Sequence, residues 1–109
     1  MRIALATAVA AALVMTGPAL ASDPVTSECL FTATPNAGIP GFNAETLRAG
    51  SAAECMTYCS GREWCRSVDY KRSDGACYIQ PVGMHDAELR YDYPGNPYDH
   101  YTCEQRVGP

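Results

Sequence analysis

The chain has 109 residues, and its eight basic and twelve acidic residues give a formal net charge of −4 with both histidines neutral. This acidic balance disfavours nucleic acid, anionic membranes and heparin-like polyanions as partners, because each of them demands a basic surface. Six cysteines in so short a chain predict a disulfide framework, since an even number of cysteines is typical of small exported domains.

Residues 1–21 are predicted to be a cleaved signal peptide. Arg2 supplies a positive start, residues 3–15 are almost all apolar, and Ala19-Leu20-Ala21 is the small-x-small pattern that signal peptidase needs. A membrane anchor is disfavoured, because the apolar run is too short to span a bilayer. We therefore expect a secreted or periplasmic protein with no membrane insertion after cleavage of the signal peptide.

The remaining residues, 22–109, are enough for a single domain and not for two. Residues 29–34 are rich in β-forming types and predict a first strand that ends at Pro35. The segment 37–50 carries several glycines and is predicted to be mostly turn, with brief extended pieces around Phe42 and Leu47.

One helix is predicted, over residues 52–59. Ser51 and Glu54 form a capping box, in which each side chain accepts a hydrogen bond from the other's backbone amide. Gly61 predicts a left-handed stop at the other end. The helix is too short to be stable alone, so it must be held against the rest of the domain.

A β-hairpin is predicted after the helix. Its strands are residues 65–71 and 76–80, and Arg72-Ser73-Asp74-Gly75 between them is a tight-turn sequence. Residues 81–97 are polar and irregular and predict a long loop. Residues 98–104 then predict the last strand.

Together, these features resemble the PAN/Apple domain. The resemblance lies in the C-x3-C of the capped helix, the strand Cys65-x-x-Val68-x-Tyr70 and the returning Cys77-x-Ile79. Cys29 at the first strand and Tyr101-Thr102-Cys103 at the last fit it too, so the likeness covers residues 29–103. It implies a small disulfide-linked α+β domain in which a curved antiparallel β-sheet cradles one short α-helix.

The resemblance also implies how the cysteines pair. Six cysteines permit fifteen pairings, and the sequence alone does not choose among them. A helix places residues four apart on one face, so Cys55 and Cys59 both face the hairpin, which is consistent with the family pattern. The implied bonds are Cys29–Cys103, Cys55–Cys77 and Cys59–Cys65.

Neither a metal site, a cofactor nor an active site is predicted. Zinc sites usually pair tighter cysteine knuckles than these, and an oxidising destination favours disulfides. His85 and His100 each stand beside an aspartate, but neighbouring residues rarely face each other in a strand, so both are predicted to be solvated surface histidines. No nucleophile stands beside an obvious base. A weaker alternative is a glycosidase-like pair drawn from four aspartates: Asp69, Asp74, Asp86 and Asp92.

We therefore expect a binding module that recognises a protein or a carbohydrate, as the resemblance implies. The candidate ligand-binding residues are Tyr91, Tyr93 and Tyr98 of the long loop, with Trp64 beyond the helix as an outlying candidate. Tyrosine and tryptophan suit both sugar stacking and protein hot spots, because each joins a flat apolar ring to a hydrogen-bonding tip. The alternative is a small structural or inhibitory subunit of an envelope or extracellular complex. The sequence predicts no oligomeric state.

Overall fold

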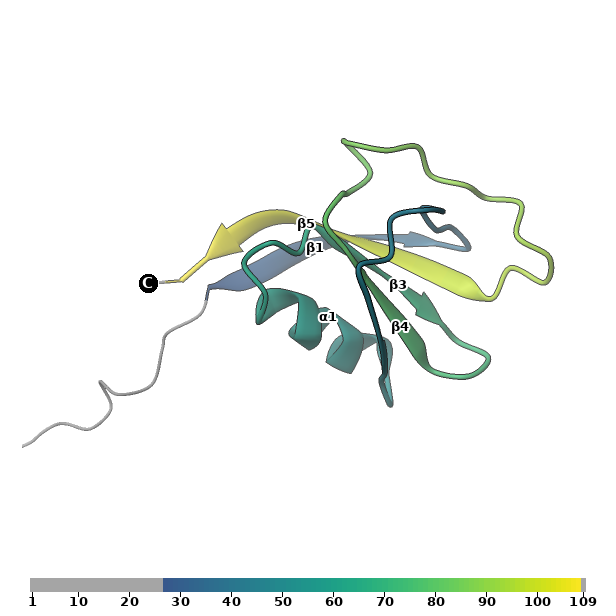
Figure 1. Cartoon of the computed structure of the whole chain (residues 1–109), viewed down its shortest axis with the longest axis horizontal. Coiled ribbons are helices and arrows are strands. Elements are labelled where there is room, and N and C mark those ends of the chain that lie inside the picture. The colour runs from purple at the N-terminus through teal and green to yellow at the C-terminus, as the bar shows by residue number, and fades with distance from the viewer. Residues whose placement is uncertain (1–26, 109) are drawn as a thin grey trace, which may run out of the picture.

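The computed structural model describes residues 27–108, so the predicted signal peptide and its cleavage site lie outside the described residues. The described chain forms a five-stranded antiparallel sheet and one helix (Figure 1), which confirms the predicted α+β class. No helix in this part of the chain is long and apolar enough to cross a membrane. In chain order the elements are β1 (Glu28–Pro35), β2 (Glu45–Arg48), α1 (Ala52–Ser60), β3 (Ser67–Lys71), β4 (Ala76–Gln80) and β5 (Tyr98–Val107).

The strands follow the order β1-β5-β3-β4-β2 across the sheet. The β3–β4 hairpin is confirmed, although β3 begins at Ser67 rather than at Cys65, and Gly75 takes the positive φ of +78° that its turn requires. The extended piece expected at Leu47 is β2, which pairs with β4 at one edge. The piece expected at Phe42 was wrong: the chain turns at Gly41, with φ +90°, and residues 42–44 belong to no strand.

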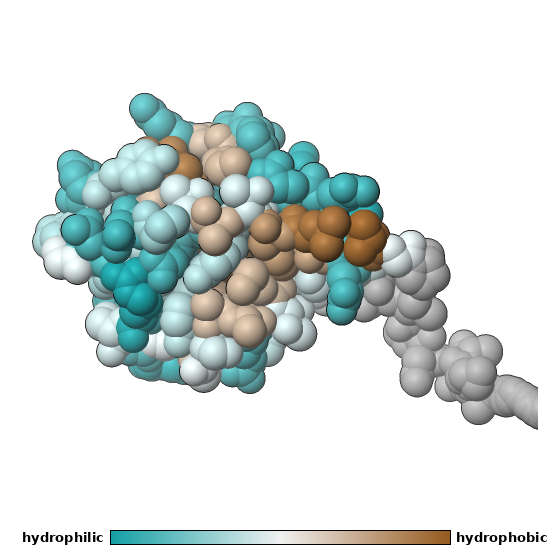
Figure 2. All heavy atoms as spheres, turned by 180° about the vertical axis from the view of Figure 1, so that it is seen from behind, coloured by the Kyte–Doolittle hydropathy of each residue, from teal (hydrophilic) through white to brown (hydrophobic). Residues whose placement is uncertain are grey.

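β1 forms the other edge of the sheet. Its pairing with β5 shifts at a bulge between Leu30 and Phe31, and Pro35 ends it. Bulges and proline are common at edge strands because they discourage pairing with a second chain. Leu30 is exposed, and Figure 2 shows hydrophobic atoms gathered at the end of the sheet where the described chain begins, on a face that is otherwise largely hydrophilic.

One face of the sheet packs against α1. Side chains alternate between the two faces of a strand, so Val68, Cys77 and Ile79 point to the same side. They are fully buried together with Cys55 and Cys59 from the helix. This is the apolar core, and the disulfides run through it.

The opposite face of the sheet is polar and yet also buried. Figure 1 shows that the long loop 81–97 arches over the side of the sheet away from α1. It is tied to the segment before β2 by a β-bridge between Gly38 and Arg90. Because strand side chains alternate, the residues of β3, β4 and β5 that do not face α1 point to this side, and five of them are buried. They are Ser67, Asp69, Gln80, His100 and Thr102, which we call the polar layer.

The cysteines pair as the family resemblance implies. Cys29–Cys103 links β1 to β5, Cys55–Cys77 links the helix to β4, and Cys59–Cys65 closes the connection from the helix to β3. Their Cα–Cα distances are 5.2, 5.5 and 5.3 Å, within the usual range for a disulfide. The helix is thereby fixed covalently to the strand beneath it.

The start of α1 follows half of the predicted capping box. The Ser51 hydroxyl accepts from the Glu54 amide at 3.1 Å, as expected. The Glu54 carboxylate, however, accepts from the amide of Gly50 rather than from that of Ser51. The reciprocal arm of the box was therefore misplaced by one residue, although it still satisfies a backbone donor just before the helix.

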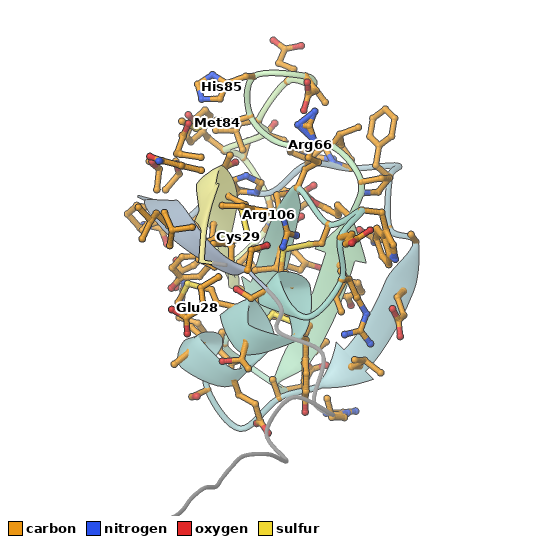
Figure 3. The ribbon with its side chains drawn as sticks, turned by 90° about the vertical axis from the view of Figure 1, so that its left-hand side faces the viewer. Glu28, Cys29, Arg66, Met84, His85 and Arg106 are labelled. Atoms are coloured by element: carbon orange, nitrogen blue, oxygen red, sulfur yellow. A yellow bond between two sulfur atoms is a disulfide. The ribbon has the colours of Figure 1, made fainter. Side chains whose placement is uncertain are left out.

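The end of α1 differs from the prediction. Gly61 is right-handed, with φ −76°, so the expected left-handed stop was wrong. Arg106 of β5 reaches the end of the helix instead and lies against the connection from the helix to β3 (Figure 3). Its guanidinium binds carbonyls of the last helical turn and of the connection to β3, while the Gly61 amide donates to the Thr57 carbonyl without a left-handed turn. The guanidinium donates to the carbonyls of Cys59, Ser60, Arg62 and Cys65.

Candidate functional site

A small cleft opens on the loop-covered side of the sheet, and we call it the tyrosine cleft. Its volume of about 230 Å³ lies below the roughly 300–1,000 Å³ typical of small-molecule sites, so it can take one side chain or one ring. Three of its seven lining residues are tyrosines, and one is an aspartate. The lining residues are Ile39, Pro40, Asn43, Asp69, Tyr78, Tyr93 and Tyr98.

Three different elements supply the tyrosines. Tyr78 projects from β4, Tyr98 is the first residue of β5, and Tyr93 comes from the long loop. The ring centroids of Tyr93 and Tyr98 are 4.7 Å apart, and those of Tyr78 and Tyr98 are 6.0 Å apart, both tilted. Tilted pairs at these distances are favourable because ring edges meet ring faces. The three tyrosine rings therefore pack against one another, and this packing restricts their orientations.

The environment favours the protonated form of the phenols of Tyr78 and Tyr93. Burial raises the pKa of Tyr78, and the neighbouring Tyr98 hydroxyl adds to that effect. Burial likewise raises the pKa of Tyr93, with a further contribution from the Asp69 carboxylate. The hydroxyl groups are therefore available as hydrogen-bond donors well into the alkaline range.

Asp69 connects the cleft to the polar layer. The residue is only 4% exposed, and its Oδ2 accepts from the Ile39 amide at 2.9 Å and from Gln80 Nε2 at 2.8 Å. Its Oδ1 lies 2.7 Å from Nδ1 of His100, the residue opposite it on β5. A buried carboxylate needs such donors to be tolerated away from water.

The prediction for His100 was wrong. This side chain is fully buried, and its partner is Asp69 across the sheet rather than the adjacent Asp99. The reason is that His100 points to the face that the long loop covers. His85 is exposed, as predicted, and its Nε2 lies 2.9 Å from a carboxylate oxygen of Glu104.

The Asp69–His100–Thr102 series has the order of a hydrolase triad, with His100 Nε2 2.5 Å from Thr102 Oγ1. No single segment of the sequence holds all three residues, so no local motif reveals the series. Thr102, however, is only 2% exposed, and its hydroxyl oxygen already accepts from the Met84 amide. A substrate carbonyl cannot reach that oxygen, so the series serves as a structural hydrogen-bond network.

The other aspartates suggested as a glycosidase pair are each engaged separately. Asp74 accepts from the Ala76 amide in the hairpin turn, Asp86 accepts from the Gly83 amide, and Asp92 pairs with Arg90. Within residues 27–108 no group of three His, Cys, Asp or Glu side chains is placed to hold a metal ion.

The predicted ligand-binding residues fall into three places. Tyr93 and Tyr98 lie together in the tyrosine cleft, partly buried rather than exposed. Tyr91 is 59% exposed and lines a neighbouring hollow that shares Pro40 with the cleft. Trp64 is 43% exposed on the connection between α1 and β3, and it does not line the cleft.

The sequence analysis overlooked Tyr78 and Asp69 as cleft residues. A usable signal was present, because the alternating pattern of β3 and β4 places both on the side away from Val68 and Ile79. What the pattern did not reveal was that a loop covers this side and leaves a cleft there.

A disulfide-linked sheet that carries one helix on one face and a cleft lined by tyrosines on the other defines a small disulfide-rich α+β domain. A family model described as "PAN domain" matches residues 29–103. The chain therefore belongs to the PAN domain family, whose members are generally binding modules rather than catalysts. No curated protein was found to match the chain.

Proposed function

We propose that this chain is an exported recognition module that binds a protein or carbohydrate partner through the tyrosine cleft. The observation that carries the proposal is the convergence of Tyr78, Tyr93 and Tyr98 on one small cleft in a PAN domain. Export is supported by the predicted signal peptide and by the disulfide framework, which suits an oxidising compartment.

The construction of the cleft favours recognition. The β4 and β5 tyrosines stand on a sheet that the disulfides hold in place, and the polar layer fixes the carboxylate beneath them. A preorganised surface loses little conformational entropy when a ligand binds. Tyrosine side chains also contribute a large binding free energy relative to the contact area that they bury, because each has an aromatic face and a hydroxyl group.

The exposed Tyr91 extends this surface along the loop in our proposal, since its hollow adjoins the cleft at Pro40. Loops whose ends are fixed by a rigid framework are common sites of recognition. Trp64 stays a prediction from the sequence and is tested separately by Trp64→Ala.

The experiment is a pull-down from host extract combined with a glycan array, using the oxidised protein. Tyr93→Leu removes one wall of the cleft. Tyr58→Leu is the matched control, because Tyr58 belongs to α1 on the opposite face of the sheet. Circular dichroism checks that both variants fold.

We expect Tyr93→Leu to weaken capture of the partner about tenfold or more, as for a hot-spot tyrosine, and Tyr58→Leu to leave capture unchanged. Equal capture by the wild type and by folded Tyr93→Leu would show that the contact surface lies elsewhere on the domain.

A further inference from the structure

We infer that the tyrosine cleft binds a cationic side chain, the ammonium group of a lysine on a protein partner. This inference rests on the proposed function and deepens it by naming the class of ligand. It follows from the charge state of the Asp69 network, from the free acceptor capacity of the carboxylate and from the aromatic walls.

In the tautomer that we assign to His100, the hydrogen bonds around Asp69 are all satisfied without a counter-ion. The Thr102 oxygen accepts from the Met84 amide, so its own hydrogen is free to point to His100 Nε2. His100 then carries its hydrogen on Nδ1 and donates it to Asp69. The imidazole is neutral in this arrangement, and the other donors to Asp69 are neutral amides from Ile39 and Gln80. In this assignment the partners of Asp69 bring no formal positive charge to the carboxylate beside the cleft.

Asp69 also has acceptor capacity left. A carboxylate offers about four lone-pair positions, and the described protein groups use three of them, one on Oδ1 and two on Oδ2. A buried charge with neutral partners gains more from an opposite charge than an exposed one does, because the low local dielectric strengthens the attraction. A ligand ammonium is the group that meets both requirements.

The walls of the cleft suit the same ligand. The faces of aromatic rings attract cations through their negative quadrupole, and several rings around one point form the kind of cage that holds ammonium groups. Tyr78, Tyr93 and Tyr98 supply the rings, and Ile39 and Pro40 supply apolar surface for the methylene stem of a lysine.

Within residues 27–108, no lysine or arginine lines the cleft. Lys71 Nζ is 5.9 Å from the centroid of Tyr98, and the Arg90 guanidinium is 4.6 Å from that of Tyr93, but neither residue lines the cleft. Each has a carboxylate of its own, with Lys71 3.7 Å from Asp74 and Arg90 2.6 Å from Asp92. Asp69 is thus the one carboxylate in the lining, and with His100 in the neutral form assigned above no formal positive charge faces it.

A neutral sugar could stack on the rings and form hydrogen bonds with the hydroxyl groups, but it carries no positive charge to pair with the Asp69 carboxylate. The charge of the lining therefore favours a lysine over a glycan, and the glycan becomes an outcome of the test.

The experiment is an NMR titration of the oxidised protein carrying labelled tyrosine rings. The main probe is lysine with both backbone termini blocked, as Nα-acetyl-lysine methylamide. Its matched control is the same compound acetylated on Nε, which keeps the stem and removes the charge. Methyl glucoside and methyl galactoside test the glycan alternative.

We expect the lysine probe to shift the ring signals of Tyr78, Tyr93 and Tyr98, and the Nε-acetylated probe to bind about tenfold more weakly or worse. Binding should weaken as salt is added, because it depends on an unpaired charge. Asp69→Asn should lower the affinity for lysine by about tenfold or more. Tyr93→Leu provides a second variant should Asp69→Asn fail to fold, and Tyr58→Leu should bind like the wild type.

Equal binding of the charged and acetylated probes overturns the inference, as does an absence of shifts with lysine. If a methyl glycoside shifts the cleft tyrosines while lysine does not, the ligand class is wrong and the proposed recognition role of the cleft still stands. If folded Tyr93→Leu also captures the partner normally in the pull-down, the proposed function fails as well.

Discussion

Removing the outer disulfide should destabilise the domain more than removing the inner one. The perturbations are the double variants Cys29→Ala/Cys103→Ala and Cys59→Ala/Cys65→Ala. A disulfide stabilises the fold mainly by restricting the unfolded chain, and the restriction grows with the length of the loop that it closes. The two loops differ greatly, with sequence separations of 74 and 6.

The magnitude depends on how the bonds are nested. The Cys55–Cys77 bond lies inside the outer loop and removes the 22 positions that it spans from the shortest covalent path between Cys29 and Cys103. The path closed by the outer bond therefore falls from 74 to about 52 positions, which corresponds to about 4 kcal/mol in the chain-entropy model. The same relation gives about 2 kcal/mol for the inner loop, with its separation of 6.

Packing partly offsets this difference. Cys59 and Cys65 are fully buried, whereas Cys103 is partly exposed, so the inner variant loses more packing when its sulfurs are removed. The gap of about 2 kcal/mol from loop entropy is therefore an upper value.

The assay is equilibrium unfolding in urea, followed by circular dichroism. We expect the outer variant to have the lower midpoint and also the larger m-value, because its unfolded chain expands and exposes more surface. An inner variant that is the less stable of the two, or an outer variant with an unchanged m-value, would refute the chain-entropy reasoning.

Three further outcomes are expected. Asp69→Ala should cost about 2–6 kcal/mol, because it leaves the Ile39 amide and His100 Nδ1 without an acceptor, whereas Gln80 keeps its bonds to the Ile39 carbonyl and Asn43. Urea unfolding measures this loss, and a value under about 1 kcal/mol would contradict the stabilising role of the polar layer. Burial raises the pKa of Tyr78 and Tyr93, so the folded state keeps protons at a pH where the unfolded state has lost them. The contribution of these protons to the free energy of unfolding is complete below about pH 10 and is lost as the pH rises through the folded-state pKa. Absorbance titration of tyrosinate checks it, and ordinary phenol titration in the folded protein would contradict it. Gly75→Ala should cost about 1–3 kcal/mol or more, since its φ is +78° and its new methyl would lie 2.8 Å from the Ala49 carbonyl oxygen; a thermal melt unchanged from the wild type would contradict this.

The sequence by itself determined the elements whose causes are local. Side-chain alternation and turn chemistry are properties of a few adjacent residues, which is why the β3–β4 hairpin and its Gly75 turn could be placed. Ser51 acts on an amide three residues away, so the start of α1 was also readable. The family pattern of cysteines added the pairing that spacing alone left open among fifteen possibilities.

The end of α1 and the environment of His100 were decided by tertiary contacts. Arg106 reaches the end of the helix from β5, more than forty positions along the chain, and no local pattern around Gly61 reveals this contact. The polar residues around His100 predict that it is exposed to water. His100 is buried instead because the long loop folds over the polar face of the sheet.

The tyrosine cleft depended on the fold in the same way. Tyr93 and Tyr98 were visible as candidates, but Tyr78 and Asp69 joined them only through the pairing of β3 with β4 and β5. Strand alternation determines which side of a sheet a residue faces, and it carries no information on what covers that side. The sequence therefore determined the faces, and only the packing of the long loop over one of them turned a row of polar and aromatic residues into a cleft with a buried charge.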